Sequence, residues 1–223
     1  MVRRNAEKGF SLLELVLVVA IVLVVAAMSI PSVVSAMYNL RLRSSAYSVS
    51  GILQTARTEA IRANSERYVC YAKDANGVAR VWVQDKYDCV AIADLDDPSK
   101  GLATKYQQVV LGTNVSVVPA FAAGSPATGL TSADVGFSGV IASNAAMFSK
   151  PMFNARGTPC YKNAASVARC NSLVNGLLQP YSAAQLWYLT DKRPTQGTGW
   201  AAVAVSPAGR VQVWSFNGIK WNR

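Results

Sequence analysis

The chain contains no histidine, and this absence narrows its possible chemistry. A Ser-His-Asp triad needs that side chain, and so do most catalytic zinc sites. The sequence also has no glycine-rich phosphate loop, no dinucleotide fingerprint and no serine in a nucleophile-elbow context. Its four cysteines form no CxxC pair, which disfavours a metal site. We therefore predict a non-enzymatic protein with no metal and no cofactor.

Charge is almost missing from one long stretch near the N-terminus. From Leu15 to Ile30 every residue except Ser29 is apolar, and counted from Phe10 the segment reaches the ~20 residues that a helix needs to cross a bilayer. Glu14 is the exception, and a charge at bilayer depth costs several kcal/mol, with about 2.5–3.5 as the low estimate. No Lys or Arg lies between Phe10 and Met37. We therefore expect the partner of Glu14 on another molecule or at a chain terminus.

Basic residues precede this apolar run and indicate its orientation. By the positive-inside rule, Arg3, Arg4 and Lys8 place the N-terminus in the cytoplasm and the rest of the chain in the periplasm or outside the cell. Two other interpretations remain open. One is an ordinary signal peptide cleaved after the small residues at 34–36, although the apolar run exceeds the usual ~7–15 residues. The other is a simple uncut anchor.

The stretch Lys8-Gly9-Phe10 with Glu14 beyond it resembles the N-terminus of type IV prepilins and type II secretion pseudopilins. The resemblance implies that a prepilin peptidase cuts between Gly9 and Phe10 and methylates the new amine of Phe10. It implies that Glu14 neutralises that amine, typically on a neighbouring subunit, and that Pro31 is the helix-bending proline of many relatives. The implied partners are other pilins, the peptidase and the inner-membrane assembly platform. The implied location is the inner membrane and an assembled pilus or pseudopilus.

Helical periodicity continues beyond Pro31. Apolar residues at alternating spacings of three and four form one stripe of a helix that reaches about Ser65. The stripe consists of Leu42, Ala46, Val49, Leu53, Ala56, Ala60 and Ala63. We predict an α+β fold in which this long helix packs against antiparallel β-sheets. The predicted parts are a leader (1–9), a transmembrane and assembly helix (10–37) and a head (38–223), itself divided into an amphipathic helix (38–66) and a β-rich region (67–223).

The β-rich region shows clear turn signals at both ends. Runs at 68–73 and 78–84 flank Asp74–Gly77, whose Asn-Gly end favours a hairpin. The C-terminal runs 200–206, 210–216 and 219–222 predict a meander with two tight turns. Further strands are expected at 147–153 and 186–190, and 107–111 and 115–118 are expected to pair with each other. Residues 85–106 are predicted to be a solvated loop, and the acidic residues 94, 96 and 97 leave calcium binding as the weaker alternative.

The cysteines fit export to an oxidising compartment. Cys70 and Cys89 flank the first predicted hairpin, and Cys160 and Cys170 enclose a short loop. We predict the disulfides Cys70–Cys89 and Cys160–Cys170, although sequence alone does not fix the connectivity.

Three further blocks narrow the resemblance. Residues 53–64, which include Ala56-Arg57-Thr58-Glu59-Ala60-Ile61, look like a helix segment of the GspH/FimT family. Residues 153–159 resemble that family's internal Phe-x-x-x-Gly turn, and 205–211 resemble its C-terminal Gly-Arg strand. The family comprises minor pseudopilins of type II secretion and minor pilins of type IV pili.

Positive charge is concentrated at the C-terminal end. Residues 135–223 hold nine Lys and Arg and one acid, a net charge of +8, whereas residues 10–134 are neutral overall. Such asymmetry suggests an acidic partner, such as nucleic acid or an anionic envelope surface. The resemblance to FimT-like minor pilins implies DNA capture through arginines near the Gly-Arg strand. The candidate DNA-binding residues are Arg210, Gln212, Lys220 and Arg223. The alternative is that these charges only form a solvated face and that the nearby aromatic residues belong to the core or to an interface.

Overall fold

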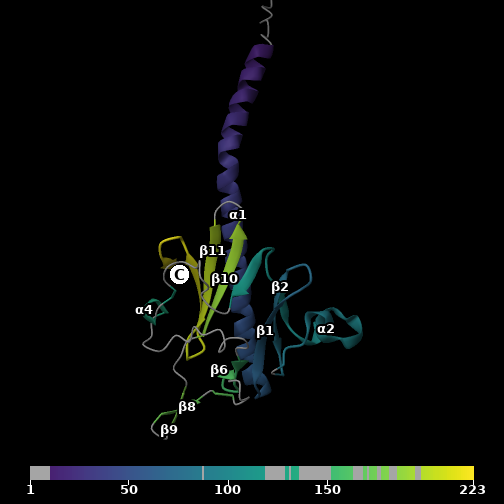
Figure 1. Ribbon diagram of the computed structural model, residues 1–223, viewed down its shortest axis with the longest axis vertical. Coiled ribbons are helices and arrows are strands. Elements are labelled where there is room, and N and C mark those ends of the chain that lie inside the picture. The colour runs from purple at the N-terminus through teal and green to yellow at the C-terminus, as the bar shows by residue number, and fades with distance from the viewer. Residues whose placement is uncertain are drawn as a thin grey trace, which may run out of the picture. The chain divides into compact units, whose positions relative to one another are not determined.

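Helix α1 (Leu12–Ala63) is the longest element of the structure, and it confirms the predicted continuous helix. The computed structural model describes residues 11–86, 88–118, 129–130, 132–135, 152–162, 168–169, 171–174, 177–180, 185–193 and 197–223 (Figure 1). The chain divides into two compact units, Met1–Tyr38 and Asn39–Arg223. We call the second unit the head.

Within the described residues, the head contains two main antiparallel sheets and one small one. The first sheet has the strand order β3-β2-β1-β5-β6-β7, the second has the order β13-β12-β11-β10-β4, and β8 pairs with β9. The strands of the first sheet are β1 (Arg67–Lys73), β2 (Ala79–Gln84), β3 (Gln108–Val110), β5 (Met152–Phe153), β6 (Pro159–Lys162) and β7 (Ala168–Arg169). Those of the others are β4 (Val115–Val118), β8 (Asn171–Val174), β9 (Leu177–Pro180), β10 (Gln185–Arg193), β11 (Gly197–Val205), β12 (Val211–Phe216) and β13 (Trp221–Asn222). The α+β class is therefore as predicted.

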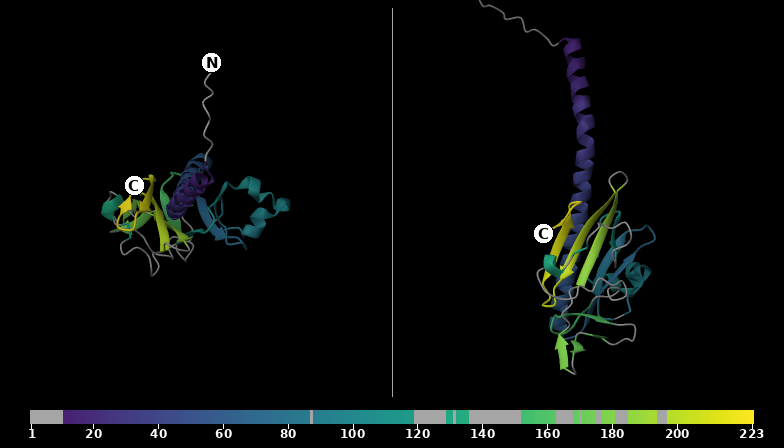
Figure 2. Two further views of the ribbon diagram at one scale, coloured as in Figure 1. Left: turned by 90° about the horizontal axis from the view of Figure 1, so that it is seen from above. Right: turned by 60° about the vertical axis from the view of Figure 1, so that its left-hand side comes forward.

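The head segment of α1 lies between the two main sheets, as Figure 2 shows from above. Small residues of the predicted stripe let the sheets approach the helix closely, and Ala46, Val49, Leu53, Ala56 and Ala60 are all fully buried. They pack against inward-facing side chains of both sheets. These are Val69, Val81, Val83, Phe153, Trp187, Leu189, Ala201, Val203 and Val205. The stripe ends one turn earlier than predicted, because Ala63 is exposed.

The outer face of the second sheet is also covered. Leu186, Tyr188 and Trp200 pack there with Leu130 and with Val135 of the short helix α4 (Ser132–Val135). Because both faces are buried, β11 is a nearly continuous apolar run instead of an alternating one.

Both predicted hairpin regions are confirmed. β1 and β2 pair in the register Cys70↔Trp82, and the carboxylate of Asp74 accepts hydrogen bonds from the backbone N–H groups of Asn76 and Val78 in the turn. β11, β12 and β13 form the C-terminal meander.

Two predictions for the middle of the chain were wrong. β3 and β4 do not pair with each other, since β3 joins β2 in the first sheet and β4 joins β10 in the second. The connection between them crosses α1, where the N–H of Gly112 donates to Oγ of Ser45 at 3.0 Å.

Residues 85–106 are also not a simple loop, because they contain α2 (Ile92–Asp96), the 3-10 helix η1 (Pro98–Lys100) and α3 (Leu102–Lys105). Leu95 and Tyr106 anchor this segment on Trp82, and that packing stabilises helices too short to form alone. The predicted strand 147–153 is seen as β5, and its residues before Met152 lie outside the described part of the chain.

Candidate assembly site and head surface

The N-terminal part of α1 exposes apolar side chains on all sides. Every residue from Ser11 to Val34 is exposed. Within the described residues, α1 is the one helix long and apolar enough to cross a bilayer, with a mean hydropathy of 2.9 in its most apolar window and none of that window buried. A signal sequence would meet the same criterion. The segment therefore has to bury its surface in lipid or against other protein molecules.

Glu14 lies in the first turn of α1, and its side chain is exposed among these apolar residues. A carboxylate at this position interacts favourably with the positive end of the helix dipole. The described residues supply no basic side chain to it, because the first Lys or Arg after Phe10 is Arg41. Gly9 and Phe10, the predicted processing residues, lie outside the described part of the chain.

Pro31 sits inside α1, which continues through it. Proline cannot donate the hydrogen bond that the carbonyl of Ala27 would normally accept. Serine hydroxyls around the proline bond back to the helix backbone: Ser29 Oγ donates to the Val25 carbonyl at 2.9 Å, and Ser35 Oγ donates to the Pro31 carbonyl at 3.0 Å. Polar side chains satisfied within the helix in this way cost little in an apolar environment.

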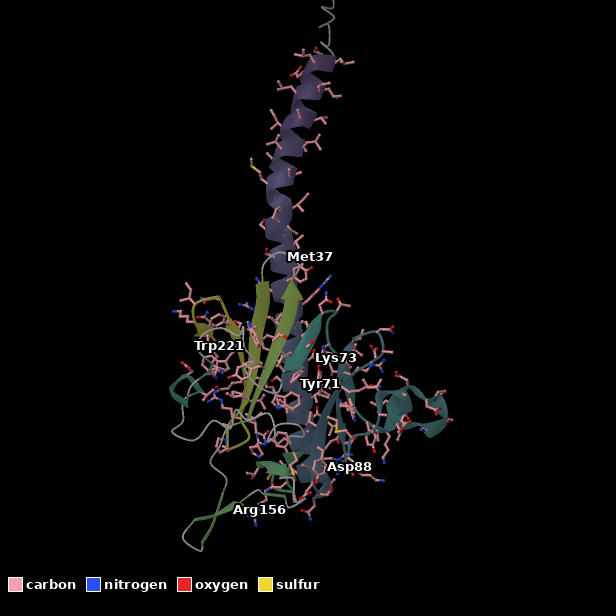
Figure 3. The ribbon with its side chains drawn as sticks, in the orientation of Figure 1. Met37, Tyr71, Lys73, Asp88, Arg156 and Trp221 are labelled. Carbon is pink, nitrogen blue, oxygen red and sulfur yellow. A yellow bond between two sulfur atoms is a disulfide. The ribbon has the colours of Figure 1, made fainter. Side chains whose placement is uncertain are left out.

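The Cys70–Cys89 disulfide forms as predicted, with Cα atoms 5.8 Å apart and a sequence separation of 19 (Figure 3). It fastens the segment after β2 to the outer face of β1. In the chain-entropy model, a loop of this length contributes about 3 kcal/mol of stability. Cys160 is fully buried, whereas Cys170 lies outside the described residues, so the second disulfide stays a prediction.

The acidic residues near position 95 interact with nearby groups of the same chain. Asp94 pairs with Lys100, Asp96 pairs with Arg80, and Asp97 caps η1 by accepting from the N–H of Ser99 at 2.9 Å. The hydrogen bonds from Ser99 lower the pKa of Asp97 below its ordinary value. No cluster of potential metal ligands occurs in the part of the chain that the structure describes. The arrangement gives no support to the calcium alternative.

The three blocks that resemble the GspH/FimT family meet at one place, which we call the Arg57 junction. It joins Arg57 and Ile61 of α1, Gly157 in the β5–β6 turn and Gly209 in the β11–β12 turn. Nη1 of Arg57 donates to the carbonyl oxygen of Gly209 at 3.0 Å. Both glycines have positive φ angles, 72° and 79°. A Cβ on Gly209 would lie 2.8 Å from Cζ of Arg57, and a Cβ on Gly157 would lie 2.7 Å from Cδ1 of Ile61. The junction holds the turns of both sheets against the helix.

Periodicity did not reveal the part played by Arg57, because this residue lies off the apolar stripe. The available signal was the pair of glycines in turn sequences, which indicates close backbone approach. The sequence does not show which residue approaches these glycines, so that signal could not identify Arg57.

The structure separates the candidate DNA-binding residues. Arg210 is exposed in the β11–β12 turn, and Lys220 is exposed in the β12–β13 turn. The six-residue strand β12 lies between these turns, which places them about 20 Å apart. Arg223 is exposed and Gln212 is half-buried.

The aromatic residues nearby are mostly committed to packing. Trp214, Phe216 and Trp221 contact the cluster on the outer face of the second sheet, and the rings of Phe216 and Trp221 lie 5.3 Å apart. Burial raises the pKa of Tyr188 in the same cluster to about 12. These rings are therefore poorly placed to stack on unpaired bases, which weakens that part of the DNA hypothesis.

Comparison with known proteins agrees with the N-terminal geometry. Residues 4–30 match the family described as the prokaryotic N-terminal methylation motif. No solved structure matches the chain significantly. The chain thus carries the N-terminal signal of type IV pilins and pseudopilins, followed by a long apolar helix and a β-rich head, and it fits a type IV pilin-like protein. These features indicate a structural subunit that is anchored in a membrane through its N-terminus, is processed by prepilin peptidase and assembles with other pilins.

Proposed function

We propose that this protein is a minor pilin or pseudopilin, a non-enzymatic subunit of a type IV pilus or a type II secretion pseudopilus. The observation that carries the proposal is Glu14, an exposed carboxylate in a helix segment that is otherwise uncharged and lies within the matched methylation motif. Cleavage between Gly9 and Phe10 would create an amine four residues before it. The N-terminus is then cytoplasmic before assembly, and the head is outside the inner membrane.

Assembly would provide the partner that Glu14 lacks among the described residues. When subunit helices pack side by side, the carboxylate of one can neutralise the N-terminal amine of its neighbour. Such a pair in a low-dielectric environment is costly to break, because removing one charge leaves the other buried and uncompensated. The assembly platform of the inner membrane would bring the subunits together.

The test replaces Glu14 by Gln, which keeps the size of the side chain and removes its charge. We expect E14Q to be exported and membrane-inserted but to enter sheared filaments or crosslinked assemblies at less than about a tenth of the wild-type level, a loss equivalent to 1.4 kcal/mol or more. The matched control is Glu59→Gln, which removes a carboxylate that faces Arg67 in the head at 3.6 Å. Wild-type assembly by E14Q would overturn the proposal.

Processing can be checked independently by mass spectrometry of protein from its native host. The proposal requires a chain that begins at N-methylated Phe10. A chain that begins at Met37 would instead indicate ordinary signal peptidase cleavage and remove the basis of the pilin assignment.

A second candidate function is DNA binding during uptake, as in FimT-like minor pilins. The net charge of +8 in residues 135–223 and the exposed Arg210 favour it. The test titrates the full chain in detergent with short DNA at two salt concentrations. Binding through several phosphates falls steeply with salt, and Arg210→Glu should weaken it more than Arg62→Glu on the exposed face of α1. Absence of binding at low salt would leave the assembly role alone.

A further inference from the structure

Two contacts fix the direction in which β12 runs along α1. Arg57 bonds the carbonyl of Gly209 just before β12, and Nη2 of Arg43 donates to Oγ of Ser215 near the end of β12 at 3.4 Å. The two arginines are separated by about 21 Å of helix and the two partners by about 20 Å of strand. β12 therefore runs antiparallel to α1 over this length. Its last residues, and the β12–β13 turn that follows, lie at the end of the head where the chain enters at Asn39.

The β12–β13 turn exposes one apolar side chain, that of Ile219, to solvent. Asn217 Oδ1 accepts from the N–H groups of Ile219 at 3.0 Å and Lys220 at 2.9 Å, and Gly218 has a φ of 96°. These interactions fix the turn with Ile219 at its tip. Ile219 is 86% exposed, the highest value for any large apolar side chain that the structure describes.

Other exposed apolar residues lie at the same end, on the side of the first sheet. Leu40 and Val110 are 66% and 57% exposed. They line an open cavity of about 420 Å³ with Arg41 and with the backbone of Gly112. A single exposed isoleucine is ordinary on a protein surface. At this end of the head, however, exposed apolar residues lie on both sides of α1.

The same end of the head is basic. Arg41, Arg43 and Lys220 are exposed there. Asp191, the one acid after residue 134, is buried. The far end of the head, where Figure 3 labels Arg156, is also basic, because Arg156 and Arg210 are exposed there beside the Arg57 junction. What distinguishes the end at Asn39 is the exposed isoleucine at its tip.

We infer that this end of the head, defined by Leu40, Arg41, Arg43, Ile219 and Lys220, docks on the surface of an anionic lipid bilayer. We call it the entry face. Peripheral binding of this kind combines a buried apolar tip with cations that meet lipid phosphates. The inference rests on the proposed membrane anchoring, since Val34, the last residue of the fully exposed segment of α1, lies about two helical turns before Arg41. Long arginine side chains at that distance can reach the headgroups.

Two observations favour lipid over nucleic acid as the partner of the entry face. The exposed tip is aliphatic, whereas single-stranded DNA is held by stacking on exposed rings, and the nearby rings of Trp214 and Trp221 are packed into the head. The membrane segment also tethers this face near a bilayer, so that docking requires no free encounter. Docking would hold the head against the membrane until the subunit is extracted for assembly.

The test measures the depth of the turn in a bilayer. Full chain carrying Ile219→Cys is labelled with a small apolar fluorophore and reconstituted in nanodiscs of phosphatidylcholine, with or without about one-third phosphatidylglycerol, and with nitroxide headgroups as quenchers. The matched control is Ala208→Cys, which is also in an exposed turn but at the other end of β12. We expect quenching at 219 to be at least about twice that at 208 in anionic discs. The excess should fall when Arg43→Glu and Lys220→Glu are added, and when salt is raised, because charge attraction is screened.

Equal quenching at 219 and 208, or quenching at 219 that is indifferent to phosphatidylglycerol, would overturn the inference. The label at position 219 could remain unquenched while short DNA binds the discs with an affinity that Lys220→Glu lowers. In that case the entry face is a nucleic-acid-binding surface instead. Retention of the chain in the discs on size exclusion reports anchoring separately. Loss of the chain from the discs would count against the proposed function, whereas retention without the 219 signal would count against docking alone.

Discussion

The two parts of α1 have the same secondary structure and opposite relations to their surroundings. From residue 11 to 34 every side chain is exposed, whereas from Leu42 to Ala60 one face is buried under two sheets. The first part is made of large apolar residues and the second buries mostly small ones. Large residues all round a helix suit lipid or a bundle of subunits, while small residues on one stripe allow a close sheet. The helix thus supports folding with one part and assembly with the other.

The largest effect should come from creating a cavity in the buried part. Leu53 is 0% exposed, and Leu53→Ala should lower the free energy of unfolding of the head by about 2–5 kcal/mol. All five tryptophans lie beyond residue 80, so tryptophan fluorescence during denaturation of the full chain in detergent reports the head alone. Leu17→Ala, at a position 57% exposed, is the matched control and should change that value by less than about 0.5 kcal/mol. Similar losses for both variants would mean that the two parts of the helix are not energetically distinct.

The second-largest effect is expected at the Arg57 junction, in the buried part of α1. Gly209→Ala adds a methyl group 2.8 Å from Cζ of Arg57 and 2.9 Å from the carbonyl oxygen of Gly157, at a positive φ. Backbone strain of about 1 kcal/mol and a steric clash of about 1–3 kcal/mol should together destabilise the head by about 2–4 kcal/mol.

Gly218→Ala separates these two causes. Gly218 also has a positive φ, but nothing lies within 4 Å of the added methyl group, so only the strain of about 1 kcal/mol should remain. Equal effects at both glycines in a denaturation experiment would show that the contact with Arg57 adds nothing.

Local signals in the sequence predicted the local elements. The period of the apolar stripe gave α1, the Asn-Gly turn gave the β1–β2 hairpin, and the two glycine turns gave the C-terminal meander. The choice of partner for β3 and β4 was missed, because neighbours in sequence usually pair and nothing local records that the chain crosses α1 between them. The helices at 92–105 were missed because their stability comes from packing on Trp82.

In the candidate site, too, local features could be predicted from the sequence and long-range contacts could not. Glu14 could be singled out from the sequence alone, since a carboxylate in an apolar run is unusual whatever the fold. Arg210 and Lys220 are close in sequence and were grouped by charge, but a strand holds them at opposite ends of one edge of the head. Charge counting cannot detect that separation. The role of Arg57 depends on three segments far apart in the chain, and only the folded structure brings them together.

The smallest predicted effect concerns the exposed face of the buried part. Gly51 lies in the interior of α1, is exposed, and has no atom within 4 Å of an added Cβ. Glycine in a helix interior is less favourable than alanine by about 0.5–1 kcal/mol, because it loses more backbone entropy on folding. Gly51→Ala should therefore stabilise the head by that amount in denaturation of the full chain. If the variant is stabilised but enters assemblies less well than the wild type, Gly51 marks a close contact with a neighbouring subunit, and the division of α1 into a folding part and an assembly part would need to be redrawn. If the variant is destabilised, the face of α1 around Gly51 is packed more tightly within the chain than the structure shows.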